Sequence, residues 1–133
     1  MHNESTHQKF TTDQMMDLVE TWLMSGELNP IILSEKFQFN SPFWKEANKT
    51  DFVAKFVDTT VYQETSLAKI THFDPVIQLK SSDQNHFAIV LQYHTKNGQH
   101  VYETVFGTME DGMLVELRSI YDLDETKKAL DIN

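Results

Sequence analysis

The sequence predicts an α+β protein in which N-terminal helices pack on a curved antiparallel sheet. Apolar residues recur at helical spacing in the first half of the chain and at alternate positions in the second half. In the second half, Asn97-Gly98 and Asp111-Gly112 separate three alternating runs, and both dipeptides favour tight hairpin turns. The three runs are long for strands, and long strands in a small domain are usually strongly curved.

Length and composition favour one domain. The chain has 133 residues, of which 40% are hydrophobic and 11% aromatic, enough for one sizeable core and too little for two ordinary domains. Residues 1–10 are polar and lack a helix cap, so we expect a flexible tail there and a single domain over residues 11–133.

The charge and the lack of cysteine exclude several classes of protein. A net charge of −9 repels phosphate backbones and anionic lipids, so we expect neither nucleic acid nor a membrane as a partner. The chain has no cysteine and its six histidines lack close metal-binding spacing, so we expect no disulfide and no metal site. No cofactor motif is present, and no cofactor is expected. Without a leader pattern or a long apolar run, a cytoplasmic location is the simplest expectation.

Three helices are predicted before the sheet. Thr11 and Gln14 form a capping-box pattern, and apolar residues at helical spacing follow until Gly26. Asn29-Pro30 then opens a short helix to about residue 36, followed by a short strand over residues 37–39. Asn48 caps a third helix that ends near residue 62.

Strands follow from about residue 66. The pattern over Leu67–Lys80 predicts a strand that is broken at Asp74-Pro75. The break is expected because proline has no backbone N–H to donate to a neighbouring strand. The longer strands are Phe87–Thr95, Gln99–Met109 and Met113–Tyr121, and Asp124–Ile132 is a short terminal helix.

The register of the first hairpin decides which residues share a face. A two-residue turn at Asn97-Gly98 places Gln92 opposite Glu103 and His94 opposite Val101. The second hairpin leaves two alternatives, either Asp111-Gly112 alone as the loop or Glu110-Asp111-Gly112 with a glycine bulge. One face of the first hairpin is then mixed, with Val90, Gln92, His94, Val101, Glu103 and Val105, and the other is apolar, with Phe87, Ile89, Leu91, Tyr93, Tyr102 and Phe106.

The chain resembles the nuclear transport factor 2-like, or SnoaL-like, superfamily. The resemblance lies in the order of these elements, in the segment Phe37-Gln38-Phe39-Asn40-Ser41-Pro42 and in the final strand from Asp111 to Asp122. The resemblance covers about residues 12–123. It implies a cone-shaped, cystatin-like fold whose curved sheet and helices enclose a pocket, and whose convex sheet face commonly joins a second subunit.

The resemblance also implies site residues. A small-molecule pocket would be lined by Trp22, Asn40, Ser41, Trp44, Phe56, Val90, Gln92, Val101, Val105 and Tyr121. A homodimer would form through the apolar stripe of Phe87, Ile89, Leu91, Tyr93, Tyr102 and Phe106.

The working groups of the ketosteroid isomerase branch are absent at the matching positions. Ser41 stands where that branch has the general base, Gly107 near its acidic oxyanion-hole residue, and Val19 or Trp22 near its tyrosine. Because a serine without a neighbouring base cannot abstract a proton from carbon, steroid isomerisation is not expected.

Glu103 and His94 are the candidate catalytic residues. Burial would raise the pKa of the Glu103 carboxyl and suit it to acid-base chemistry. In the alternative, Gln92 and Glu103 form a solvated cross-strand hydrogen bond at the rim of the cone and have no catalytic role. Asn40 and Ser41 are better explained as turn formers than as ligand contacts, and packing explains Trp44 as well as a role at the pocket does.

Two classes of function remain open from the sequence. The first is a SnoaL-like protein that binds an apolar or polyketide-like molecule in the cone cavity, either as a binding protein or as an enzyme with cofactor-free acid-base chemistry. The second is a non-catalytic dimerisation or protein-interaction module. Fold alone does not decide between them.

Overall fold

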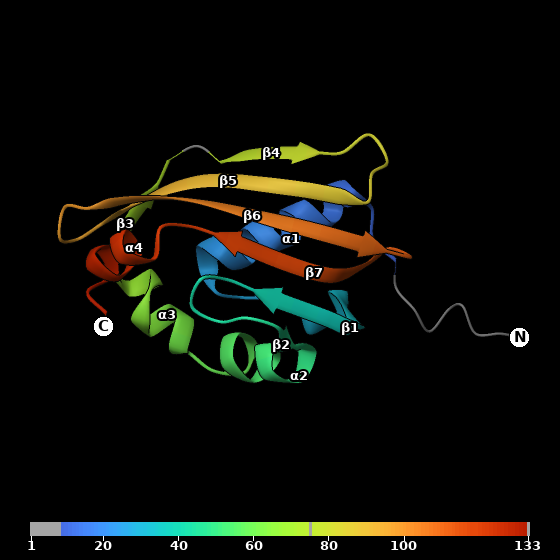
Figure 1. The fold of residues 1–133 in the computed structure, drawn as a ribbon, viewed down its shortest axis with the longest axis horizontal. Coiled ribbons are helices and arrows are strands. Elements are labelled where there is room, and N and C mark those ends of the chain that lie inside the picture. Colours follow the sequence, from blue (N-terminus) through green and yellow to red (C-terminus); the bar gives the residue numbers. More distant parts are fainter. Residues whose placement is uncertain (1–8, 75, 133) are drawn as a thin grey trace, which may run out of the picture.

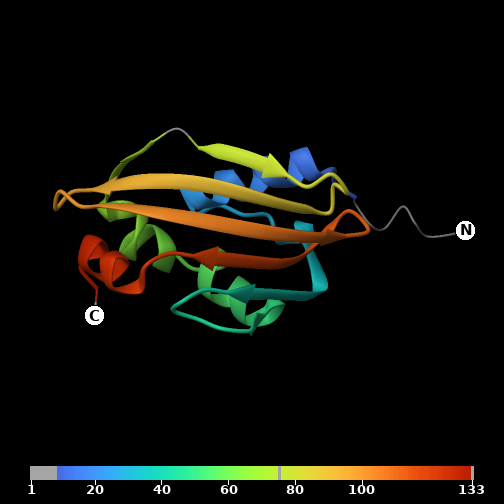
Figure 2. The same cartoon turned by 45° about the horizontal axis from the view of Figure 1, so that its top comes forward.

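The computed structural model describes residues 9–74 and 76–132, and Figures 1 and 2 show a curved sheet with the helices on one of its faces. The elements in chain order are α1 (Thr12–Ser25), the 3₁₀ turn η2 (Pro30–Ile32), β1 (Leu33–Asn40), β2 (Ala47–Asn48), α2 (Lys49–Phe52), the π-helical segment η3 (Val53–Val57), α3 (Val61–Thr65), the 3₁₀ turn η4 (Leu67–Lys69), β3 (Ile70–Phe73), β4 (Ile77–Lys80), β5 (His86–Thr95), β6 (His100–Glu110), β7 (Met113–Ile120) and α4 (Leu123–Leu130). The predicted α+β class and curved sheet are confirmed.

The sheet has seven strands in the order β2-β1-β7-β6-β5-β3, and β4 also pairs with β5. β1 runs parallel to β7, whereas the other pairs are antiparallel. The two longest strands, β5 and β6, therefore lie side by side with β7 at the centre (Figure 1).

The first helix forms as the sequence predicts. The Thr11 hydroxyl accepts the N–H of Gln14, the Gln14 side chain accepts the N–H of Thr11, and Gly26 ends the helix in the left-handed conformation. The predicted tail lies outside the described residues up to residue 8. Phe10 is described, and its N–H donates to the Gly112 carbonyl at 2.9 Å.

The predictions for the next two helices were partly wrong. The Asn29-Pro30 helix stops at Ile32, because the chain from Leu33 pairs with β7 instead. The helix capped by Asn48 passes into the π-helical segment η3, where the Asp58 N–H donates to the Val53 carbonyl at 2.8 Å, and α3 begins separately at Val61. The π segment interrupts the predicted single helix.

The predicted register of the first hairpin was wrong by one residue. The loop has three residues, Lys96 to Gly98, and Thr95 pairs with Gln99 through an N–H···O bond of 2.9 Å. A two-residue turn would require a positive φ at both Asn97 and Gly98, and only Gly98 has one, at +84°. The Asn97 amide instead donates to the Lys128 carbonyl at the end of α4, at 3.1 Å.

This shift exchanges the two faces of β5. Leu91 lies opposite Glu103, and Tyr93 lies opposite Val101, so these side chains share the inner face under the helices. Four residues of the predicted dimer stripe are therefore buried core residues, namely Phe87, Ile89, Leu91 and Tyr93. The predicted pocket residues Val90 and Gln92 and the candidate catalytic residue His94 lie on the outer face. On β6, the predicted inward face of Val101, Glu103 and Val105 agrees with the structure.

The second hairpin combines features of both alternatives. Its loop is Asp111-Gly112 alone, with φ of +52° and +73°, and Glu110 pairs with Met113. A register shift then follows between Thr108 and Met109. Beyond it, each residue of β6 pairs with a β7 residue one position further along the chain than the two-residue loop alone would give. No helix in the described part of the chain is long and apolar enough to cross a membrane.

We predict that Gly107→Ala destabilises the fold by about 1–3 kcal/mol, because a Cβ at this position would overlap the ring of Phe87 on the neighbouring strand. Urea unfolding of the single variant and of a double variant with Phe87→Leu measures the effect. The alanine should cost less in the Phe87→Leu background, and an equal cost in both backgrounds would contradict the steric explanation.

Candidate functional site

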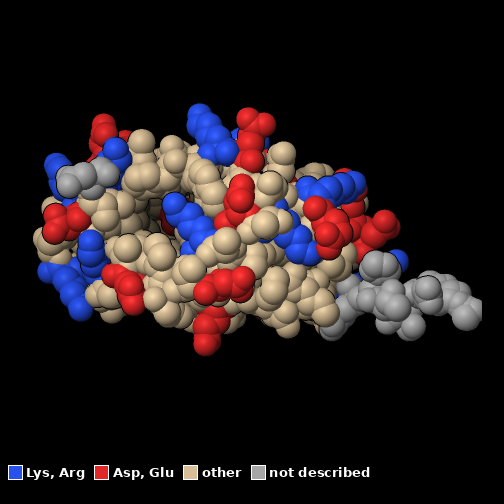
Figure 3. Space-filling view, turned by 90° about the horizontal axis from the view of Figure 1, so that it is seen from below, with Lys and Arg blue, Asp and Glu red and all other residues tan. Residues whose placement is uncertain are grey.

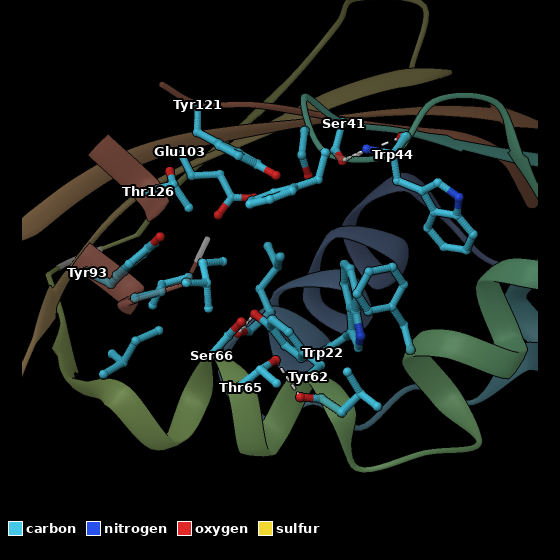
Figure 4. A pocket seen from close by; sticks show the side chains of 18 of the residues that line it. Trp22, Ser41, Trp44, Tyr62, Thr65, Ser66, Tyr93, Glu103, Tyr121 and Thr126 are labelled. Atoms are coloured by element: carbon cyan, nitrogen blue, oxygen red, sulfur yellow. Dashed lines mark hydrogen bonds between the residues drawn. The ribbon is translucent and has the colours of Figure 1, made fainter. Parts of the chain in front are cut away.

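A cavity of about 370 Å³ lies between the inner face of the sheet and the helices. Such a volume is within the range of pockets that bind small molecules. Figure 4 shows side chains from the sheet on one side of the cavity and from the helices on the other. The residues that line it are Trp22, Leu23, Phe39, Ser41, Phe43, Trp44, Lys55, Phe56, Val61, Tyr62, Thr65, Ser66, Ile70, Phe73, Leu91, Tyr93, Glu103, Ser119, Tyr121, Thr126, Leu130 and Ile132.

An aromatic cluster builds the helical wall of this cavity. The Trp22 ring meets Phe52 edge-on at 5.5 Å and Phe56 at 6.0 Å, and lies 5.6 Å from Tyr62. Edge-to-face contacts of this kind fix ring orientations beyond what burial alone achieves. The wall is therefore rigid and mainly apolar.

Trp44 and Lys55 are neighbours in the cavity lining. The Lys55 ammonium lies 5.0 Å from the centre of the Trp44 ring, a cation–π contact. Figure 3 shows a hollow on the lower face of the molecule with a basic side chain beside it. Because Lys55 has a long flexible stem, it can move without disturbing the cavity wall.

Glu103 is the only carboxylate among the residues that line the cavity in the described part of the chain. Burial raises the pKa of the Glu103 carboxyl to about 7, although a hydrogen bond with the Ser119 side chain, which favours the charged form, opposes part of this rise. Near neutral pH the group thus exchanges a proton readily. That property is required of a general acid or base.

Three tyrosines lie around Glu103. Burial raises the pKa of Tyr62, Tyr93 and Tyr121, and the nearby charge of Glu103 raises each further. Their hydroxyls are therefore neutral at physiological pH and keep the proton of a hydrogen-bond donor. Tyr62 already donates to the Leu23 carbonyl at 2.7 Å.

Two buried polar atoms of the lining have no hydrogen-bond partner within the described residues. They are the indole Nε1 of Trp22 and the hydroxyl of Thr126. A buried polar group without a partner costs about 1–3 kcal/mol. A ligand with an oxygen near either group would recover part of that cost.

Ser41 is held by its own turn. Its hydroxyl accepts the Trp44 N–H at 3.1 Å, and its backbone N–H donates to the Trp44 carbonyl at 2.8 Å. Figure 4 shows this contact at the edge of the cavity. Ser41 therefore positions Trp44 in the cavity lining.

The structure brings together six of the sequence-predicted site residues, namely Trp22, Ser41, Trp44, Phe56, Glu103 and Tyr121. Val101 and Val105 are buried in the core without lining the cavity. Asn40 lies outside the lining, where its amide donates to Glu116 at 3.2 Å and its oxygen accepts the Glu46 N–H at 2.9 Å.

His94, the second candidate catalytic residue, does not reach the cavity. It lies on the outer face with Val90 and Gln92 because of the register shift described above. The sequence reasoning missed Tyr62, Tyr93, Ser119 and Thr126. The correct length of the first hairpin turn would have placed Tyr93 on the inner face. Tyr62 and Thr126 lie on helices, and no local sequence pattern indicates how those helices pack on the sheet.

No protein-family model and no curated protein matches the chain. Solved structures do match. A nuclear transport factor 2-like protein of unknown function from Cytophaga hutchinsonii is 15% identical, with a TM-score of 0.56 over 86% of this chain and 93% of the other. The chain has the nuclear transport factor 2-like fold.

Two further structures show the same fold. A candidate polyketide cyclase from Pseudomonas putida is 15% identical, with a TM-score of 0.64 over 87% of this chain and 95% of the other. A protein with a ketosteroid isomerase-like fold from Catenulispora acidiphila, solved with trimethylamine, is 10% identical, with a TM-score of 0.57 over 88% of this chain and 94% of the other. The superfamily resemblance of the sequence is thereby confirmed at the level of the fold.

We predict that the Glu103 carboxyl titrates with a midpoint near 7 in a carbon-13 NMR titration. Because the pKa of Glu103 is higher in the folded than in the unfolded chain, protonation of Glu103 favours the folded state. This contribution to stability is fully present below about pH 4.5 and is lost as the pH rises through about 7. The free energy of unfolding of Glu103→Gln relative to the wild type should therefore increase by up to about 3 kcal/mol between these pH values.

The exposed Glu27→Gln serves as the control and should show no such trend. A Glu103 midpoint at or below about 4.3, the usual value for glutamate, would mean a solvated carboxylate and would rule out the acid-base role.

Proposed function

We propose that the cavity binds a small, mainly apolar organic molecule that carries a carbonyl group, and that Glu103 transfers a proton to or from it. The observation that carries this proposal is the position of Glu103 in an apolar cavity, where burial raises its pKa to about 7. A general base is most effective when its pKa lies near the working pH.

Proton abstraction from the carbon next to the carbonyl is the reaction that this site suits best. The carboxylate takes the proton, and negative charge develops on the carbonyl oxygen. Neutral hydroxyls of Tyr93 and Tyr121 can donate to that oxygen, as can the unpartnered indole of Trp22. Such a transfer needs no cofactor.

The structural neighbours support a small-molecule function. One is a candidate polyketide cyclase, and another was crystallised with trimethylamine. A polyketide-like substrate, with several carbonyl groups along a carbon skeleton, fits the combination of aromatic walls and a single carboxyl. The open cavity favours this function over a role confined to protein interaction, in which the pocket would be filled by side chains.

The outer face of the sheet supports a homodimer in addition. Tyr102 is 68% exposed, Ile120 52% and Phe106 43%, and all three lie on the neighbouring strands β6 and β7. We call these three residues the outer apolar patch. Tyr102 and Phe106 belong to the predicted interface, whereas the β5 residues of that prediction face inwards.

We predict that the protein accelerates hydrogen–deuterium exchange next to the carbonyl of 2-tetralone, a bicyclic aromatic ketone, in deuterated water. Glu103→Gln should reduce this exchange by about 100-fold or more, because it removes the proton acceptor. Proton NMR measures the exchange, and saturation-transfer NMR measures binding of the ketone.

Binding of 2-tetralone should persist in Glu103→Gln, and Glu27→Gln should exchange like the wild type. The wild-type rate should rise as the pH passes through about 7, where Glu103 loses its proton. Equal exchange rates in Glu103→Gln and the wild type would remove Glu103 from the mechanism.

We predict that analytical ultracentrifugation at micromolar concentration gives twice the monomer mass of 15.5 kDa. Replacing Tyr102 and Phe106 of the outer apolar patch by lysine should yield monomers, because the charges could not be buried. Ile31→Lys, at a residue that is 48% exposed outside the sheet's outer face, should leave the dimer intact. A wild-type monomer would contradict the proposal.

A further inference from the structure

Three histidines form a row across the outer face of the sheet, away from the cavity. His72 on β3 is the Cα partner of His94 on β5, and His94 is the partner of His100 on β6. Directly paired residues on neighbouring strands point to the same side of a sheet. The His72 and His94 rings are stacked almost in parallel, with centroids 4.2 Å apart, and the His100 ring lies 5.8 Å from that of His94.

Asp74 completes the cluster. Its carboxylate Oδ2 lies 2.8 Å from Nε2 of His94, and its backbone N–H donates to the Gln92 carbonyl at 2.8 Å, which fixes the residue beside β5. One ligand atom each from His72, Asp74 and His94 lies within 4.8 Å of the others. Asp74 and His94 retain 39% and 31% of their side-chain exposure, so an ion in solution can reach them.

A surface ion pair would explain the contact of His94 with Asp74 but not the position of His72. The second imidazole is stacked on the first at van der Waals distance. Two imidazoles and a carboxylate whose ligand atoms lie within 4.8 Å of one another are a donor set that zinc and related transition metals use. Tetrahedral zinc ligands lie about 3.3 Å apart, so small side-chain rotations would bring the three atoms into place.

We propose that His72, Asp74 and His94 bind one divalent transition-metal ion of the zinc class, with water completing its coordination. The net charge of −9 favours cation binding at the surface. The ion would take the place of the hydrogen bond between His94 and Asp74 and would join β3 to β5.

This site is connected to the cavity through two strands. On β3, Ile70 and Phe73 line the cavity, and on β5 Tyr93 precedes His94 and points to the opposite face. β3 is a short edge strand of four residues. A metal ion on the outer face would therefore hold one wall of the cavity in place, and the proposal does not depend on what the cavity binds.

Isothermal titration calorimetry of the full chain, stripped with a chelator and titrated with zinc chloride at about pH 7.5, tests the proposal. We expect one zinc ion per chain with micromolar affinity. His72→Ala and His94→Ala should each weaken binding by at least tenfold, because each removes a ligand.

His86→Ala is the matched control. His86 lies on the same strand and face as His94 and also contacts an aspartate, Asp83, at 3.4 Å, but it is not part of the three-residue cluster. It should bind zinc like the wild type. All variants keep His2 and His7, so zinc binding by the N-terminal residues would be unchanged across the series.

Nitrogen-15 NMR of the imidazole rings localises the ion independently of folding effects. Substoichiometric zinc should shift the ring resonances of His72 and His94 together and leave those of His86 in place. The proposal is overturned if the wild type binds zinc no more tightly than millimolar, if both alanine variants bind like the wild type, or if other ring resonances shift instead.

Discussion

The turn from Lys96 to Gly98 determines which side chains reach the cavity. Strand side chains alternate between faces, so a loop longer or shorter by one residue moves all of β5 relative to β6. The observed loop places Tyr93 and Leu91 on the inner face with Glu103. It is held by a hydrogen bond from Asn97 to the Lys128 carbonyl of α4, which also contributes Thr126 and Leu130 to the lining. The turn and the terminal helix therefore depend on each other.

The alternation of β5 also separates the molecule's two polar clusters. Tyr93 contributes to the cavity, and its neighbour His94 belongs to the outer histidine row. The apolar thickness of the sheet lies between them, so Glu103 does not interact with the histidines through a shared hydrogen bond. The two clusters are therefore connected through the positions of the strands.

Local sequence patterns predicted the structural features that depend on interactions within a few residues. The cap of α1 and the long central strands follow from side-chain hydrogen bonds and alternation within a few residues, and the strand predicted to break at Asp74 ends at Phe73. The class of fold could be predicted from these patterns because few architectures accommodate helices followed by such strands.

The remaining features depend on contacts between distant residues. The short helix after Pro30 ends early because β1 pairs in parallel with β7, about 80 residues further along the chain. Local propensity depends on neighbouring residues and does not include the energy of this pairing. The dipeptide Asn97-Gly98 favours a two-residue turn by itself, but the contact with Lys128 favours the longer loop. His72 and His94 are stacked only because β3 returns along β5, so their spacing in the sequence gives no sign of a metal site.

Glu103 is difficult to explain by packing alone. Its strand neighbours on the inner face, Val101 and Val105, are buried and apolar, and a third apolar residue between them would avoid the cost of desolvating a carboxylate. Ser119 offsets only part of that cost, since the pKa of Glu103 stays near 7. The folded state is thus less stable above neutral pH than it would be with a neutral residue. Such local instability at the wall of an open cavity is typical of a group that acts on a ligand.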